Sequence, residues 1–316
     1  MTAKRNAPGK AAASKTPTAK GGFTLISREK LNDLYAAMVK CRMLAKRASL
    51  MVQQHGLDCG LDGTARREAV AAGVAGNLQP DDALSPAAGD VMASFLKGVP
   101  LDKLLGKRKA AVNGRARRDG GYAPLNILPP SSTMAAQLNI ACGVALAGKM
   151  KKDGQITVAF CEGGADSLDS WREALIFAGI HQLPMLFIWQ RDMCATPKKL
   201  EPRSGLAEIG TKTQACGVPA ITVDANDVVA IYRVAYESVA RARQGRGPTL
   251  IECRTFRSHS RSGSITAKAG QLEGQDPIQH MESYLKRKGL FDEKLKRRVA
   301  ARFRLELNAV TKPLGN

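Results

Sequence analysis

The stretch from residue 156 to residue 192 constrains the fold more than any other part of the chain. It opens with an apolar run rich in β-branched residues (156–160) and closes with a second apolar run (184–189), and both are typical of buried strands. Between them, the Glu-Gly-Gly sequence at 162–164 predicts a tight turn, and the residues after it predict a helix with one apolar face. A strand, a turn, a helix and a second strand in this order predict a right-handed crossover in a parallel sheet.

In such a sheet, ligands bind at the carboxyl ends of the strands. Those ends here are residues 162–164 and the Gln-Arg-Asp sequence at 190–192. A helix that begins behind a glycine turn favours an anionic, phosphate-bearing ligand, because its amino end carries exposed N–H groups and a partial positive charge. An ordinary turn without a ligand is the alternative, and this stretch alone leaves both open.

Bulk properties narrow the class of protein. The chain has 316 residues, 44% of them hydrophobic, which is enough for one large α/β domain or two smaller ones. It contains no long apolar run typical of a membrane span and no apolar segment near its start typical of a secretory signal. The seven cysteines are scattered without a CxxC pair, and the four histidines are isolated, so we expect a reducing cytoplasm and no structural zinc site.

The charge is strongly basic. A net charge of +20 favours an acidic partner, a nucleic acid or an anionic surface. Residues 1–22 hold five positive charges, no acidic residue and few residues that could enter a core, so we expect a basic disordered arm followed by the folded part of the chain over 23–316. A basic run at 103–118 predicts a solvated loop or a contact with phosphate or an acidic partner.

Further elements follow from periodicity and capping signals. Expected helices cover residues 28–53, 65–77, 133–150 (capped by Ser132), 227–244 and parts of 276–310, and expected strands cover 220–223 and 249–253. A polar, serine-rich loop is expected at 257–274.

Several short motifs, taken together, resemble one family. They are Arg-Glu-Ala-Val-Ala-Ala-Gly-Val at 67–74, Lys-Gly-Val-Pro at 97–100, Val-Asp-Ala-Asn-Asp-Val at 223–228 and Gly-Pro-Thr-Leu-Ile-Glu at 247–252. In this order and spacing, the chain resembles the α subunit of thiamine-diphosphate-dependent 2-oxo acid dehydrogenases, the decarboxylating component of pyruvate, branched-chain and acetoin dehydrogenase complexes. The resemblance covers about residues 28–305 and implies the thiamine-diphosphate-binding fold, an α/β fold with helices on both faces of a parallel sheet.

The resemblance also implies thiamine diphosphate and Mg²⁺ as cofactors. Implied cofactor contacts are Gln137, Glu162, Gly163, Gly164, Ala165, Arg191 and Asp192. Implied metal ligands are Asp192, the backbone carbonyl of Cys194 and, if its turn rearranges, Glu162. His259 matches the first histidine of the family's mobile loop and is the candidate catalytic residue.

The sequence departs from the family at this site. The family's magnesium-binding aspartate aligns with Gly163, its asparagine ligand with Asp192, and the second histidine of its loop with Arg261, which cannot shuttle protons near neutral pH. A phosphate-binding arginine aligns with Gly89. These changes predict weakened or lost catalysis.

The sequence leaves three hypotheses for the function. The first is a working α subunit that pairs with a β-like subunit. The second is a non-catalytic binding or regulatory subunit whose basic surfaces bind an acyltransferase core or an acidic lipoyl domain. Nucleic-acid binding ranks last, because only 5% of the residues are aromatic and no stacking pattern is present.

Overall fold

One parallel sheet forms the centre of the molecule. The computed structural model describes residues 26–55, 66–87, 91–105, 122–129, 131, 133–162, 168–192, 217–255 and 276–311. Within them, five parallel strands pair in the order β1-β2-β3-β5-β4. The strands are β1 (Ala83–Ser85), β2 (Thr157–Glu162), β3 (Met185–Asp192), β4 (Ala220–Asp224) and β5 (Thr249–Thr255). The predicted α/β fold with a parallel sheet is confirmed.

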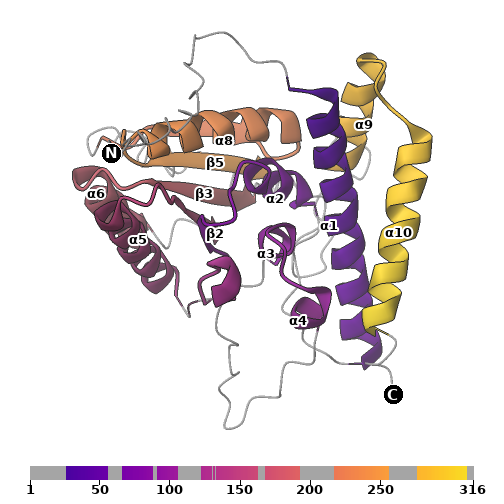
Figure 1. The fold of residues 1–316 in the computed structure, drawn as a ribbon, viewed down its shortest axis with the longest axis horizontal. Coiled ribbons are helices and arrows are strands. Elements are labelled where there is room, and N and C mark those ends of the chain that lie inside the picture. Colours follow the sequence, from indigo (N-terminus) through magenta and orange to yellow (C-terminus); the bar gives the residue numbers. More distant parts are fainter. Residues whose placement is uncertain are drawn as a thin grey trace, which may run out of the picture.

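Helices cover both faces of this sheet (Figure 1). On one face lie α5 (Met134–Lys151) and α6 (Leu168–Ile180), which pack against each other. On the other face, α8 (Val228–Arg243) crosses β3, β4 and β5 and packs against α2 (Glu68–Ala75). The long helix α1 (Arg28–His55) borders α2 and pairs with α10 (Glu293–Thr311). The remaining helices are α3 (Met92–Leu96), α4 (Leu101–Leu105), α9 (Pro277–Arg287) and a 3-10 turn at Ala123–Leu125.

The alternation of side chains along the strands divides the core in two. Toward α2 and α8 point Val158, Phe160, Leu186, Ile188, Ile251 and Cys253. Toward α5 and α6 point Ala159, Cys161, Phe187, Trp189 and Leu250. Glu162 continues the first series and Arg191 the second, so the pleat sends these two site candidates to opposite faces of the sheet.

Most predicted elements are confirmed, with boundary shifts of a few residues. The three-residue strand β1 was not predicted, because it is too short to show a period. The cap of α5 is Thr133, whose hydroxyl accepts a hydrogen bond from the Ala136 amide at 3.2 Å. Phe177 of α6 is 39% exposed and lies beside His181, with 4.5 Å between ring centroids.

Several predicted segments lie outside the described residues. They are the basic arm at 1–22, the basic run from residue 106 onward, the cap of α6, and the serine-rich loop at 257–274. In the described ranges, none of the helices combines the length and apolar character needed to cross a membrane.

Candidate functional site

The carboxyl ends of β2 and β3 carry the polar residues that the sequence places at the site. Glu162 ends β2 and lies in register with Gln190 on β3. Both follow strand positions that point toward α2, and Gln190 is buried. Polar side chains at the end of otherwise apolar strands are typical of a functional site in a parallel sheet.

Arg67, at the start of α2, reaches this end of the sheet. It is the N-cap residue of α2 and is only 2% exposed, and its Nη1 forms an ion pair with Glu162 Oε1. The preceding residue, Arg66, has a left-handed backbone with φ of 69°. Non-glycine residues adopt that conformation rarely, so the turn into α2 is held by its surroundings.

The Gln137 side chain links α5 to β2 and to the segment after β1. From α5, its side-chain amide Nε2 donates to the backbone carbonyls of Pro86, after β1, and Phe160, in β2, at 2.8 Å each. The side chain is buried. In this structure the amide group therefore connects α5 to the carboxyl ends of two strands.

Arg191 makes its contacts on the opposite face of the sheet. Its Nη1 donates to Glu252 Oε1 at 3.1 Å, and its guanidinium lies 5.5 Å from the centre of the Trp189 ring. Glu252 is fully buried and also accepts from Thr222 Oγ1 and Arg254 Nε, at 2.9 Å each. The structure thus brings Glu162 and Gln190 together and places the Arg191 guanidinium in a different cluster.

Of the other predicted site residues, only Asp192 lies within the described residues. Asp192 is the last residue of β3, with its backbone in register with Thr255. The remaining candidates lie outside the described residues: Gly163, Gly164, Ala165, Cys194 and His259. Within the described part of the chain, no group of three or more His, Cys, Asp or Glu side chains could hold a metal ion.

Comparison with known proteins settles the family. The family model of the dehydrogenase E1 component matches residues 35–312. The chain belongs to the dehydrogenase E1 component family. This confirms the resemblance found in the sequence.

Three curated E1 relatives show the range of similarity. The α subunit of acetoin:2,6-dichlorophenolindophenol oxidoreductase from Bacillus subtilis (strain 168) is 28% identical, over 82% of this chain and 82% of that protein. The α subunit of 3-methyl-2-oxobutanoate dehydrogenase from Mycobacterium tuberculosis (strain CDC 1551 / Oshkosh) is 31% identical, over 91% and 79%. The pyruvate dehydrogenase E1 component α subunit from Staphylococcus aureus (strain Mu50 / ATCC 700699) is 27% identical, over 92% and 80%.

A solved structure supports the fold. Transketolase from Campylobacter jejuni matches with a TM-score of 0.50 and 17% identity, over 92% of this chain and 49% of that chain. This chain therefore spans about half the length of that transketolase. At such low identity, the likeness shows the thiamine-diphosphate-binding fold alone.

Members of the E1 family use thiamine diphosphate, typically with a divalent metal. Mg²⁺ prefers near-octahedral oxygen ligands, which carboxylates supply well. Here the carboxylate nearest the aligned ligand position, Glu162, is paired with a buried guanidinium, and residue 163 is a glycine. The described residues of this E1 chain therefore do not fit a magnesium ion at the end of β2.

The role of Arg67 was missed in the sequence. The family motif at 67–74 showed only that a helix begins there. Two consecutive arginines before a largely apolar helix were the available signal, because an arginine at that position must either reach solvent or find a buried carboxylate.

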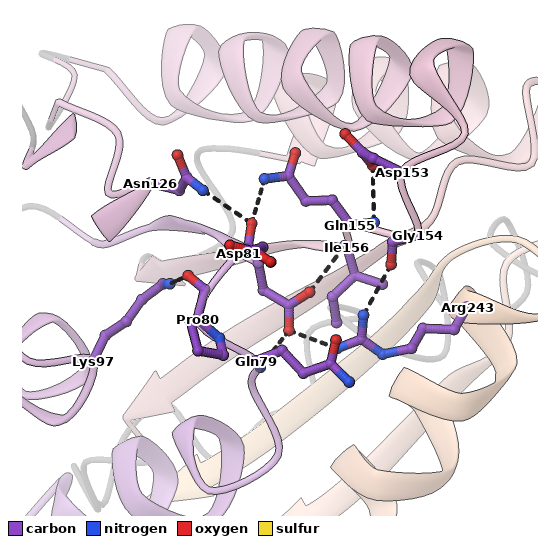
Figure 2. A network of polar contacts seen from close by, with 11 residues as sticks. Gln79, Pro80, Asp81, Lys97, Asn126, Asp153, Gly154, Gln155, Ile156 and Arg243 are labelled. Carbon is purple, nitrogen blue, oxygen red and sulfur yellow. Dashed lines mark hydrogen bonds and ion pairs between the residues drawn. The ribbon is translucent and has the colours of Figure 1, made fainter. Parts of the chain in front are cut away.

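A cleft of about 530 Å³ lies at the opposite edge of the sheet, near the amino ends of β1 and β2. Its lining includes Asp81, Lys151, Asp153 and Gln155. Figure 2 shows the polar network around it: the Asp81 carbonyl accepts from Asn126 Nδ2 at 3.0 Å and also from Gln155 Nε2. Because cofactors of this fold bind at the carboxyl edge, the cleft is not part of the candidate site.

Proposed function

We propose that this chain is an α-like subunit of a 2-oxo acid dehydrogenase whose thiamine-diphosphate-dependent catalysis is weakened or lost. The Arg67–Glu162 ion pair carries this proposal. It engages the carboxylate that could replace the missing aspartate ligand, and Gly163 has no side chain to offer. Thiamine diphosphate supplies an ylid and electron sink when bound, and the protein's part is to hold and orient it.

The proposed partner is a β-like subunit, in a heterotetramer in the cytoplasm. Exposed apolar side chains on α5 and α6 support an interface: Met150 is 75% exposed, Ile180 is 70% exposed, and Ile140 and Phe177 are also exposed. Lys149 Nζ on α5 donates to the backbone carbonyls of His181 (2.6 Å) and Gln182 (3.3 Å), so the carboxyl ends of the two helices lie side by side. Apolar side chains gathered on neighbouring helices are typical of a protein-binding surface.

A calorimetric titration tests the catalytic part of the proposal. Thiamine diphosphate with Mg²⁺ is titrated into the chain purified together with its β-like partner, and reduction of dichlorophenolindophenol is then followed with pyruvate and with 3-methyl-2-oxobutanoate. We expect binding weaker than micromolar and little dye reduction dependent on a 2-oxo acid. Micromolar or tighter, metal-dependent binding with rapid turnover would contradict weakened catalysis.

A non-catalytic binding or regulatory subunit is the second candidate. It is favoured by the basic, solvent-exposed side of α10, with Lys294, Arg297, Arg298, Arg302 and Arg304. An acidic lipoyl domain or an acyltransferase core would be the partner. Binding of an isolated lipoyl domain that weakens steeply between about 50 and 200 mM salt, with unchanged affinity when thiamine diphosphate is added, would support this candidate.

A further inference from the structure

Two consecutive residues at the start of α2 are buried charges with separate partners. Arg67 forms its ion pair with Glu162, at the end of β2. Glu68 is fully buried and forms its ion pair with Arg42 on α1, while Arg42 Nη1 also contacts Asp276 Oδ2 at 2.9 Å. Glu68 is thus engaged elsewhere, and the Arg67 guanidinium faces the carboxylate at the sheet edge.

The two side chains of this ion pair differ in burial and in the permanence of their charge. Arg67 is 2% exposed at its side chain and Glu162 is 17% exposed. A guanidinium stays protonated at all ordinary pH values, so the positive charge at this edge is fixed. A buried, permanent cation requires an anion beside it, and Glu162 is that anion in this structure.

A fixed cation next to a carboxylate excludes a second cation from the same carboxylate. A divalent metal on Glu162 would have to displace Arg67 or lie beside it, and both are unfavourable in a partly desolvated site. The left-handed backbone at Arg66 (φ 69°) ties the chain just before Arg67 to one conformation. Packing of α2 against α8 and α1 further holds the backbone of Arg67 beside the sheet edge.

We propose that the Arg67 guanidinium is the built-in cation of this site and stands in for the divalent metal that E1 proteins typically hold, so that the site binds no divalent cation at Glu162. This proposal rests on the proposed α-like function and concerns the same site. The anion that this arginine meets at the sheet edge is the Glu162 carboxylate, whose oxygens suit the planar donors of a guanidinium without a metal.

Manganese binding tests the proposal directly. Mn²⁺ prefers oxygen ligands as Mg²⁺ does, and electron paramagnetic resonance separates free from protein-bound ion. The full chain is treated with chelator, dialysed and titrated with Mn²⁺, with and without thiamine diphosphate. We expect no stoichiometric Mn²⁺ binding below about 1 mM in either case, and an affinity for thiamine diphosphate that is unchanged by EDTA, whatever its value. One tightly bound Mn²⁺ per chain would overturn the proposal.

Substitutions of Arg67 and Glu162 test whether this ion pair is what prevents Mn²⁺ binding. Arg67→Gln removes the guanidinium from the Glu162 carboxylate, and we expect Mn²⁺ to bind at least about tenfold tighter than to the parent chain. Arg67→Lys keeps the charge and is the matched control, with no gain expected. Combining Arg67→Gln with Glu162→Gln removes the carboxylate, and the gain should disappear.

The outcomes separate this proposal from the proposed function. Circular dichroism shows whether the Arg67→Gln chain is folded. If it is folded and binds Mn²⁺ no better than the parent chain, the proposed role of Arg67 is overturned. If that variant does not fold, the parent titration still decides. Dye reduction with a 2-oxo acid bears on catalysis alone, so rapid turnover without bound Mn²⁺ would contradict weakened catalysis and leave the metal-free site standing.

Discussion

The Arg191 guanidinium on β3 donates to the Glu252 carboxylate on β5 at 3.1 Å, on the face of the sheet away from Arg67. Arg254 and Thr222 donate to the same carboxylate at 2.9 Å each, so Glu252 accepts from three strands. Glu252 is fully buried, whereas the side chains of Arg191 and Arg254 are 25% and 40% exposed. The cluster therefore ties the carboxyl halves of β3, β4 and β5 together.

We predict that Glu252 matters for stability more than either arginine. Glu252→Ala leaves a hydroxyl and two guanidiniums without their shared acceptor, and we expect a loss of about 1–3 kcal/mol in the free energy of unfolding. Arg254→Ala removes a solvent-screened contact and should cost about 1 kcal/mol or less. Urea unfolding measures both. Equal losses in the two variants would show that burial does not set the energetics of this cluster.

We predict opposite effects for alanine at two helical glycines. A Cβ on Gly73 in α2 would lie 2.6 Å from Ile231 Cγ2 and 3.1 Å from the Tyr232 backbone nitrogen, both in α8. Gly73→Ala should therefore destabilise the chain by about 1–3 kcal/mol through overpacking, despite the better helix propensity of alanine. A Cβ on Gly143 in α5 would meet nothing within 4 Å, so Gly143→Ala should stabilise by about 0.5–1 kcal/mol. Thermal unfolding of the two variants beside the parent chain decides, and a stabilising Gly73→Ala would mean that α2 and α8 are less closely packed.

The sequence predicted the frame of the site well, because the frame depends on local patterns. Apolar runs marked β2 and β3, and Asp227 before an amphipathic run marked the start of α8, where its carboxylate accepts from the Val229 and Ala230 amides at 2.9 and 3.0 Å. These signals act over a few residues, so they can be seen without knowing the fold.

The pairing of charges at the site could not be predicted in the same way. Arg67 and Glu162 are 95 residues apart, and their contact depends on how α2 docks beside β2. The apolar run ends before Gln190, but β3 continues two residues beyond it, to Asp192. Only with that strand end known does the alternation of side chains show which face of the sheet the Arg191 side chain points to. The chemistry of the site thus depends on packing between elements, which periodicity does not encode.

We predict that the contact between Arg42 and Asp276 makes stability depend on pH. Burial alone would raise the pKa of Asp276, but the Arg42 guanidinium, helped by the Ile278 and Gln279 amides, outweighs it and holds that pKa below the usual 3.8. A carboxylate with a depressed pKa stabilises the fold above its unfolded pKa, and the contribution is lost as the pH falls through the folded pKa. Asp276→Asn keeps the cap on the Ile278 and Gln279 amides and removes the charge, so it should cost about 1–2 kcal/mol at pH 7 and progressively less below about pH 4.

Asp227→Asn is the matched control for this pH effect. Asp227 caps α8 with the same geometry, and the described residues give it no ion pair. Its substitution should change the melting temperature by a similar small amount across the pH range. A constant difference between Asp276→Asn and the parent from pH 7 to pH 3 would show that the Arg42 contact does not contribute through charge.

We predict that the exposed apolar side chains of α5 and α6 bind the β-like subunit. Ile140 on α5 and Ile180 on α6 are 44% and 70% exposed, so replacing both with lysine should change the free energy of unfolding by no more than about 0.5 kcal/mol each. A charge placed in an apolar interface must be desolvated on binding, so the dissociation constant for the β-like subunit should rise at least about tenfold. Leu305→Lys on α10, at a side chain that is also 70% exposed, is the control and should leave assembly unchanged. Sedimentation velocity of the co-purified subunits measures the outcome, and assembly that tolerates the α5 and α6 changes but not Leu305→Lys would place the interface on α10.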